Sequence, residues 1–239
     1  QGYLRPDGRV GTRNAIAVIS TVNCSASTSR LITNRIRESG ILKDFPNVDH
    51  VFAVTHKGGC GFPFEGHDFR VLERVLAGFA THPNVAAYLI VGLGCEGTYP
   101  AHLVESQDLV VLAATPVGAG KDRTIMRPQM LTIQEQGGIS RTVEAAVEGV
   151  RKLLPEANAC RRTEQPASKI VLGLECGGSD GNSGITANPA LGVAADMIVA
   201  QGGTAVLAET TEVYGAEHLL TRRAVSREVG EKLVEKLKW

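Results

Sequence analysis

The chain has 239 residues and carries 25 basic and 25 acidic side chains, so its formal net charge is zero. This balance gives no electrostatic attraction for nucleic acid or an anionic membrane, and no apolar stretch approaches the ~20 residues that span a bilayer. The five cysteines argue against a secreted disulfide framework. Since the first residues also lack a signal-peptide pattern, the cytoplasm is the expected compartment.

Short apolar runs predict β-strands that alternate with helices along the chain. Near-continuous apolar character over about four to eight residues is typical of strands buried on both faces, as in a parallel sheet. The β-α-β alternation implies right-handed crossovers. It predicts an α/β fold with a parallel, doubly wound sheet of the Rossmann-like or flavodoxin-like type. The runs cover residues 14–22, 50–56, 86–94, 130–134, 169–174 and 203–209.

Helical patterns fill the segments between these strands. Ser25 or Ser27 is a candidate cap for the first helix, and Gly40 suits its end. Pro83 marks the end of the second helix. Apolar side chains recur at helical spacing in two groups, which are Phe69, Leu72, Leu76 and Phe79 ahead of Pro83, and Val143, Val147, Val150 and Leu154.

A polar, proline-containing stretch predicts a division into two domains. We expect an α/β domain over residues 1–154, a linker over 155–168, and the start of a second α/β domain over 169–239. The second domain has only two predicted strands. It is expected to be incomplete, because two strands rarely form an independent sheet.

Four of the five cysteines follow predicted strands, at Cys24, Cys60, Cys95 and Cys176. In a parallel α/β sheet, the loops at the carboxyl ends of the strands collect ligands and catalytic groups. The first three cysteines lie 36 and 35 residues apart, about the length of one βα unit. We therefore predict that these loops meet at one edge of the sheet. Cys160 lies in the predicted linker and is expected to be a bystander.

Two of these loops also carry groups suited to proton transfer or metal binding. His56 precedes Cys60 by four residues, and Glu96 directly follows Cys95. Imidazole and thiolate groups bind iron or zinc, and a neutral histidine can act as a general base. A histidine at a strand end can equally be a hydrogen-bonded structural residue, so both interpretations stay open.

The segment after the fifth predicted strand is rich in glycine and polar groups. Adjacent glycines let backbone N–H groups converge on an anion, and the hydroxyl and carboxylate after them offer hydrogen bonds or a metal ligand. The next helix would present its amino end to a substrate carboxylate. The alternative is a tight turn around a structural cysteine. The candidates in this segment are Gly177, Gly178, Ser179, Asp180 and Asn188.

Arg13 and Asn14 close a basic motif, RPDGRVGTRN, ahead of the first predicted strand. Because arginine binds carboxylates in bidentate fashion, this motif could hold an acidic substrate. The alternative is a solvated N-terminal arm. The sequence contains no Walker-type P-loop and no GxGxxG fingerprint, so nucleotide binding would rest on fold analogy alone.

Several motifs together resemble the altronate/galactarate dehydratase family of sugar-acid hydro-lyases. They are RPDGRVGTRN, TVNCSA, THKGGCG, VGLGCE, GLECGGSDGNSGITANPALG and EVYGAEHLLTRRAVSREVGEKLV. These motifs are more similar to those of the galactarate branch of the family. An enzyme that removes sulfite from sulfolactate belongs to the same broad family. Members also carry a small N-terminal domain or subunit and a further C-terminal segment. The chain thus resembles a central fragment of such a protein. The N-terminal domain or subunit and the C-terminal segment are its expected partners, and the chain is also expected to form a homo-oligomer.

The resemblance implies that a sugar acid loses an α-proton and a β-hydroxyl to give a 2-keto-3-deoxy acid. It also implies dependence on Fe²⁺, with Mn²⁺ as a substitute, because a divalent metal stabilises the enediolate intermediate. An iron–sulfur cluster on three cysteines is the less favoured alternative. The alternative to an enzyme is a non-catalytic module that binds a sugar acid or a partner subunit.

The expected roles of the candidate residues follow from this resemblance. The metal ligands are Cys24, Cys60, Cys95 and Cys176, the catalytic groups are His56, Cys60, Glu96 and Asp180, and the substrate-binding groups are Arg13, Asn14, Gly177, Gly178, Ser179 and Asn188.

Overall fold

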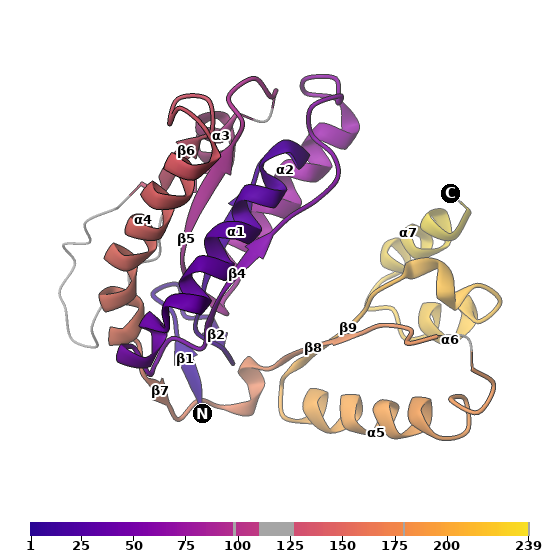
Figure 1. Ribbon diagram of the computed structural model, residues 1–239. Helices are drawn as coiled ribbons and strands as arrows, with labels where there is room; N and C mark the ends of the chain where they lie inside the picture. The colour runs from indigo at the N-terminus through magenta and orange to yellow at the C-terminus, as the bar shows by residue number, and fades with distance from the viewer. Residues whose placement is uncertain (98, 110–126, 179, 239) are drawn as a thin grey trace. The chain divides into compact units, whose positions relative to one another are not determined.

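The computed structural model describes residues 1–97, 99–109, 127–178 and 180–238 (Figure 1). The chain forms two compact units, called unit 1 (Gln1–Gln165) and unit 2 (Pro166–Trp239). In the described ranges, no helix is long and apolar enough to cross a membrane.

Unit 1 is built on a four-stranded parallel sheet in the order β4-β3-β5-β6. The strands are β3 (Ala15–Ser20), β4 (His50–Val54), β5 (Val85–Gly92) and β6 (Gln129–Thr132). Every residue of the two central strands, β3 and β5, is buried. This is expected for strands covered on both faces, and it explains their unbroken apolar sequence.

Helices cover both faces of this sheet. In the described part of unit 1 the helices are α1 (Asn23–Ser39), α2 (His67–Ala80), α3 (Pro100–Ser106) and α4 (Ile139–Ala159), with a short 3₁₀ helix, η1 (Ile41–Asp44), after α1. On one face, α1 and α4 pack against Leu89 and Val91 of β5. On the other, α2 and α3 pack against Tyr88 and Ile90. The alternation along β5 follows the two-residue period of a strand, and the predicted doubly wound α/β fold is confirmed.

The strand order fixes where a ligand site is expected. Numbered along the chain, the four parallel strands lie in the order 2-1-3-4, as in flavodoxin-like sheets. The order reverses between β3 and β5, and the crevice outside the carboxyl ends of such strands is the usual binding position.

The start of α1 differs from the prediction. Val22 is the capping residue and makes no side-chain cap bond, whereas Ser25 lies inside the helix. The buried Ser25 hydroxyl contacts the carbonyl oxygens of Val22 at 2.9 Å and Val91 at 2.8 Å. It therefore holds α1 to the end of β5. The predicted helix end is confirmed, because Gly40 adopts the left-handed conformation with φ 69°.

Much of the predicted linker is regular structure. Helix α4 continues through Pro155 to Ala159, since Leu154 and Ala157 are buried in the core. A strand follows, β7 (Arg162–Thr163), which pairs antiparallel with β1 (Gly2–Leu4); β1 also pairs with β2 (Val10–Gly11). The first unit thus extends to residue 165, beyond the predicted boundary at 154.

Unit 2 contains the two predicted strands, β8 (Val171–Leu174) and β9 (Thr204–Leu207), as a parallel pair. Its helices are α5 (Ala187–Ala200), α6 (Glu217–Thr221) and α7 (Arg227–Lys238), with 3₁₀ helices η2 (Ala167–Lys169) and η3 (Thr210–Val213). Among its described residues, Ala195 and Gly230 alone are buried. The observed part of unit 2 therefore has almost no core of its own.

Candidate functional site

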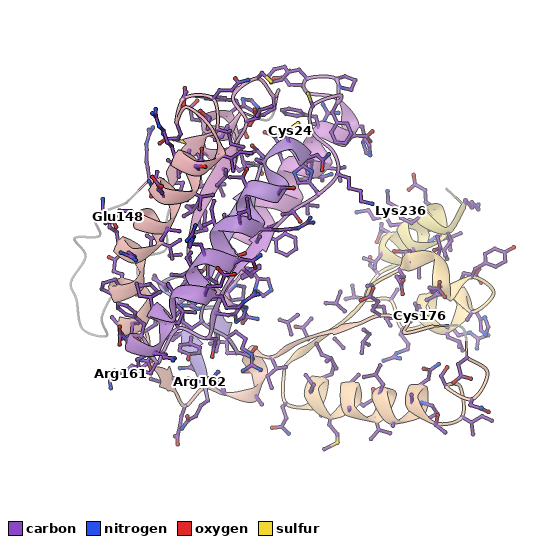
Figure 2. The ribbon with its side chains drawn as sticks, in the orientation of Figure 1. Cys24, Glu148, Arg161, Arg162, Cys176 and Lys236 are labelled. Carbon is purple, nitrogen blue, oxygen red and sulfur yellow. The ribbon has the colours of Figure 1, made fainter. Side chains whose placement is uncertain are left out.

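Three of the predicted cysteines lie in the loops that follow neighbouring strands of unit 1. Cys24 is the second residue of α1, directly beyond β3 (Figure 2). Cys60 lies between β4 and α2, and Cys95 lies between β5 and α3. All three are exposed free thiols. The carboxyl edge of the sheet thus presents three thiols to solvent.

Glu96 joins the two strand ends at which the sheet order reverses. Its buried Oε1 accepts hydrogen bonds from Thr21 Oγ1 and from the Leu93 N–H, each at 2.9 Å. Its Oε2 accepts from the Gly94 N–H at 2.6 Å. Thr21 follows β3, while Leu93 and Gly94 follow β5. Oε1 therefore links the loops after β3 and β5, and Oε2 fixes the turn within its own loop, so the carboxylate predicted to transfer protons or bind metal is already hydrogen-bonded.

His56 makes a second link between neighbouring loops. The Gly58 N–H donates to His56 Nδ1 at 3.2 Å, and His56 Nε2 lies 3.1 Å from the Ser20 carbonyl oxygen. Because Nδ1 accepts, the proton of the neutral ring is on Nε2 and is donated to Ser20. Burial lowers the pKa of His56 and favours this neutral form. Of the two interpretations left open by the sequence, this geometry favours the structural one.

The candidate metal ligands do not assemble in the described structure. Across residues 1–97, 99–109, 127–178 and 180–238, no three histidine, cysteine, aspartate or glutamate side chains come together as a metal site. Cys24, Cys60 and Cys95 share an edge, and Cys176 belongs to unit 2. Within unit 1, the three edge cysteines therefore do not form a complete ligand set, and the iron implied by the resemblance stays a prediction.

Arg13 and Asn14 lie at the amino edge of the sheet, opposite the edge that carries the cysteines of unit 1. They precede β3, whereas Cys24 follows it, and a six-residue strand is on the order of 20 Å long. Asn14 is fully buried, and its Nδ2 donates to the carbonyl oxygens of Asn47 at 2.7 Å and Ala157 at 2.8 Å. Its observed role is structural.

The N-terminal motif is packed against the rest of unit 1 through Arg5 and is not a solvated arm. Arg5 is buried, and its guanidinium donates to the carbonyl oxygens of Pro83 at 2.7 Å and Arg13 at 3.2 Å. It also lies 3.5 Å from the sulfur of Cys160, the predicted bystander. Burial raises the pKa of the Cys160 thiol, so this cysteine is held in its unreactive form.

The loop after β8 gathers the predicted residues of unit 2. The N–H of the exposed Cys176 donates to Glu209 Oε2 at 2.8 Å, which links the ends of β8 and β9. Glu209 itself has a left-handed backbone, with φ 55°. Such strain in a residue with a side chain is concentrated at functional sites. Sequence reasoning missed Glu209, and no local pattern marks it.

Asp180 organises the turn that leads into α5. Its Oδ1 accepts a hydrogen bond from the Asn182 N–H at 3.0 Å, and its carbonyl oxygen accepts from the Ser183 hydroxyl at 2.7 Å. Asn188 is exposed in the first turn of α5, as predicted. Gly177 and Gly178 are exposed just ahead of this turn, and Ser179 lies outside the described residues.

Sequence reasoning also missed a histidine–carboxylate pair near the carboxyl edge of unit 1. Glu73 of α2 is only 4% exposed, and its Oε1 lies 3.2 Å from His102 Nε2. The same oxygen accepts a hydrogen bond from the Ser106 hydroxyl at 3.0 Å. A signal was present in the sequence, because Glu73 falls between Phe69 and Leu76 on the apolar stripe of its helix.

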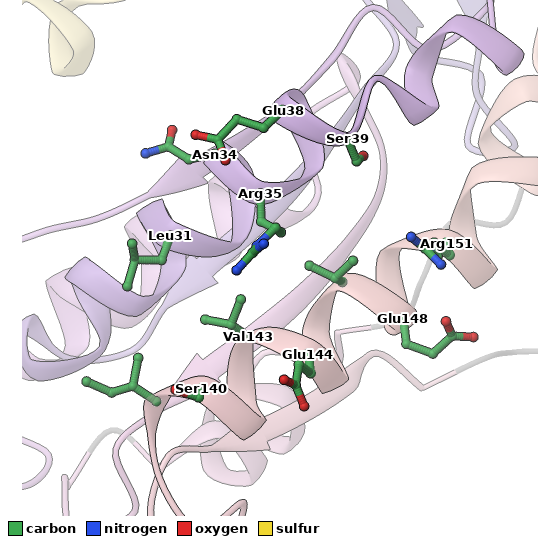
Figure 3. A pocket seen from close by; sticks show the side chains of 12 residues that line it. Leu31, Asn34, Arg35, Glu38, Ser39, Ser140, Val143, Glu144, Glu148 and Arg151 are labelled. Carbon is green, nitrogen blue, oxygen red and sulfur yellow. The ribbon is translucent and has the colours of Figure 1, made fainter.

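A separate groove lies between α1 and α4, with a cavity volume of about 730 Å³ (Figure 3). Leu31 and Val143 line it together with charged side chains of both signs, such as Arg35 and Glu144. The groove is lined by residues of these two helices and contains none of the predicted site residues. The carboxyl edge is therefore the better candidate for chemistry.

Comparison with known proteins identifies the chain's relatives. Residues 2–158 match the second domain of the D-galactarate dehydratase/altronate hydrolase family, and residues 167–239 match the C-terminal region of D-galactarate/altronate dehydratases. The chain is 34% identical to an altronate dehydratase of Bacillus subtilis, with 98% of the chain and 43% of that protein aligned. It is 36% identical to a galactarate dehydratase (L-threo-forming) of Escherichia coli, with 100% of the chain and 44% of that protein aligned.

A third relative, with lower identity, is named as a sulfo-lyase and not as a dehydratase. The chain is 29% identical to the β subunit of a (2R)-sulfolactate sulfo-lyase from Chromohalobacter salexigens, over 97% of the chain and 51% of that subunit. The chain thus spans about half or less of the length of each of these relatives. With its first match covering more than half of the chain, the protein belongs to the D-galactarate dehydratase/altronate hydrolase family.

Proposed function

We propose that this chain forms part of a hydro-lyase that converts a sugar acid, such as galactarate or altronate, to a 2-keto-3-deoxy acid. The family match and the similarity to dehydratases of both substrates support the reaction class. We place the site at the carboxyl edge of unit 1 because of the hydrogen bonds of Glu96. They join the loops after β3 and β5, at the point where the strand order of the sheet reverses.

The reaction needs a weakly acidic α-proton removed and a β-hydroxyl released. Charge develops on the substrate carboxylate, so hydrogen-bond donors that are already in place lower the barrier. In this proposal, Glu96 and His56 position the loops of unit 1, and the exposed Cys24, Cys60 and Cys95 line the reacting edge. Fixed loops matter because a misplacement of about 1 Å can cost roughly 100-fold in rate.

Unit 2 supplies a second group of candidate carboxylate-binding residues. The amino end of α5 favours an anion, and Gly177 and Gly178 leave the backbone ahead of it accessible. Asp180 and Asn188 add polar side chains on either side of the turn. The Fe²⁺ or Mn²⁺ expected from the sequence resemblance stays a prediction, and when bound it would polarise the substrate carboxylate.

Sulfolactate is the second candidate substrate, favoured by the relative from Chromohalobacter salexigens. Removal of an α-proton with release of sulfite from the β-carbon is also a β-elimination. The same proton-transfer groups would therefore suit both reactions. The dehydratases align with higher identity, so a sugar acid is the first choice.

A paired assay tests the proposal. The chain alone and the complete product of its gene are incubated anaerobically with galactarate, altronate or sulfolactate and added Fe²⁺ or Mn²⁺, and 2-keto acid is measured. We expect the complete product to act on at least one sugar acid. Inactivity on every sugar acid would refute the proposal, and sulfite release from sulfolactate alone would establish the second candidate. Activity of the complete product with an inert chain would show that the chain is a non-catalytic part.

A further inference from the structure

Glu73 is a buried carboxylate of α2 whose recorded partners are two side chains of α3, His102 and Ser106. Glu73 lies on the buried side of α2 with Phe69 and Leu76, where the desolvation of a charge is costly unless it is well paired. His102 and Ser106 provide its pairing. An apolar side chain would fill the same position at lower cost, so the buried carboxylate calls for a functional reason.

The two ring nitrogens of His102 differ in their hydrogen-bond partners. Nε2 lies 3.2 Å from Glu73 Oε1, while Nδ1 has no hydrogen-bond partner among the described residues. The side chain of His102 is 33% exposed. An imidazole with one nitrogen held by a buried carboxylate and the other open has the arrangement of a general base with its orienting group.

The pair lies beside the loops of the candidate site. His102 is the third residue of α3, which begins directly after the loop with Cys95 and Glu96. Its ring packs 5.2 Å from that of Phe64, in the loop after β4, and 5.6 Å from that of Phe69. A Cβ placed on Gly97, one residue after Glu96, would lie 3.8 Å from Phe69 and 3.9 Å from Phe64. The aromatic cluster around His102 is therefore packed against the Cys95 loop.

We propose that His102 transfers the proton in the elimination reaction, with Glu73 as its positioning residue; this inference rests on the proposed function. Neutral His102 takes the substrate α-proton at Nδ1, so a C–H bond breaks and an N–H bond forms. The electron pair stays on the substrate as the enediolate, and the Glu73 carboxylate stabilises the imidazolium. The enediolate electrons then form the C=C bond as the β-hydroxyl departs. His102 returns the proton to that hydroxyl, which leaves as water.

The test uses the complete gene product and its active sugar acid. His102→Gln keeps a hydrogen-bond donor for Glu73, and His102→Phe keeps a ring that packs against Phe64 and Phe69. Both should fold and lose at least about 100-fold in kcat, the usual scale for a general base. His50→Gln is the matched control, because His50 is an exposed histidine at the amino edge of the sheet. It should keep the parent activity.

Glu73→Gln tests the positioning role separately. It should lower kcat by about 10-fold or more with KM within twofold, because a residue that acts through His102 changes the chemical step and not substrate binding. Wild-type kcat in either folded His102 variant would overturn the inference while the proposed function stood. Unfolding of both variants would assign His102 to stability and overturn it too. An inactive parent protein would instead refute the proposed function.

Discussion

Glu96→Gln should destabilise unit 1 by about 2 kcal/mol and lower kcat by at least about 100-fold. Glu96 Oε1 accepts two hydrogen bonds, and Oε2 accepts one from the Gly94 N–H. A glutamine can place its oxygen at the first position, but its NH₂ group then faces the Gly94 N–H. That donor is left unsatisfied, and the link between the ends of β3 and β5 is weakened.

Urea unfolding and steady-state kinetics measure the two effects. Glu105→Gln is the control, because Glu105 is an exposed glutamate on the neighbouring α3 and should change neither quantity. If Glu96→Gln kept parental stability and kcat, the carboxylate bridge would not hold the site. Loss of activity at unchanged stability would instead support the catalytic role for Glu96 that the sequence predicted.

Asn14→Ala should cost about 1–3 kcal/mol of stability, because it removes the two side-chain hydrogen bonds that join the carbonyl groups of Asn47 and Ala157. The kcat and KM of the folded protein should stay within about twofold of the parent values, since Asn14 is at the amino edge of the sheet. This outcome separates the observed structural role from the substrate-binding role that the N-terminal motif suggested.

Arg13→Gln provides the comparison for Asn14, because Arg13 is exposed next to it. It should alter stability by no more than about 0.5 kcal/mol. A large rise in KM for Asn14→Ala, with stability unchanged, would contradict this account and restore the substrate-binding prediction.

The parallel strands of both units could be predicted from sequence because each consists of a local apolar run, although only those of unit 1 include buried strands. β3 and β5 are buried throughout, and the cysteines that follow them fall where parallel topology requires. The short strands β1, β2 and β7 have no such pattern, and β7 pairs with β1 from about 160 residues away, as Gly2 opposite Thr163 shows.

The candidate site was harder to predict, because its side chains are fixed by partners far away in the sequence. Ser25 has the sequence position of a helix cap, but in the structure its hydroxyl donates to the carbonyl oxygen of Val91, 66 residues later. Glu96 looks like a free carboxylate until Thr21, 75 residues earlier, binds it. Local spacing identified which loops meet, but only the fold shows which groups are already paired and which stay open, as at His102.

The central claim, that the substrate binds at the carboxyl edge of the unit 1 sheet, is tested most directly by thiol protection. The complete gene product is treated with iodoacetamide with and without saturating galactarate or altronate, and alkylation of each cysteine is followed by mass spectrometry. The half-buried Cys160 lies near Arg5 at the other end of unit 1 and serves as an internal control. We expect the substrate to slow alkylation of Cys24, Cys60 and Cys95 several-fold without affecting Cys160. Equal alkylation rates at all three edge cysteines with and without a sugar acid that the enzyme turns over would contradict the claim.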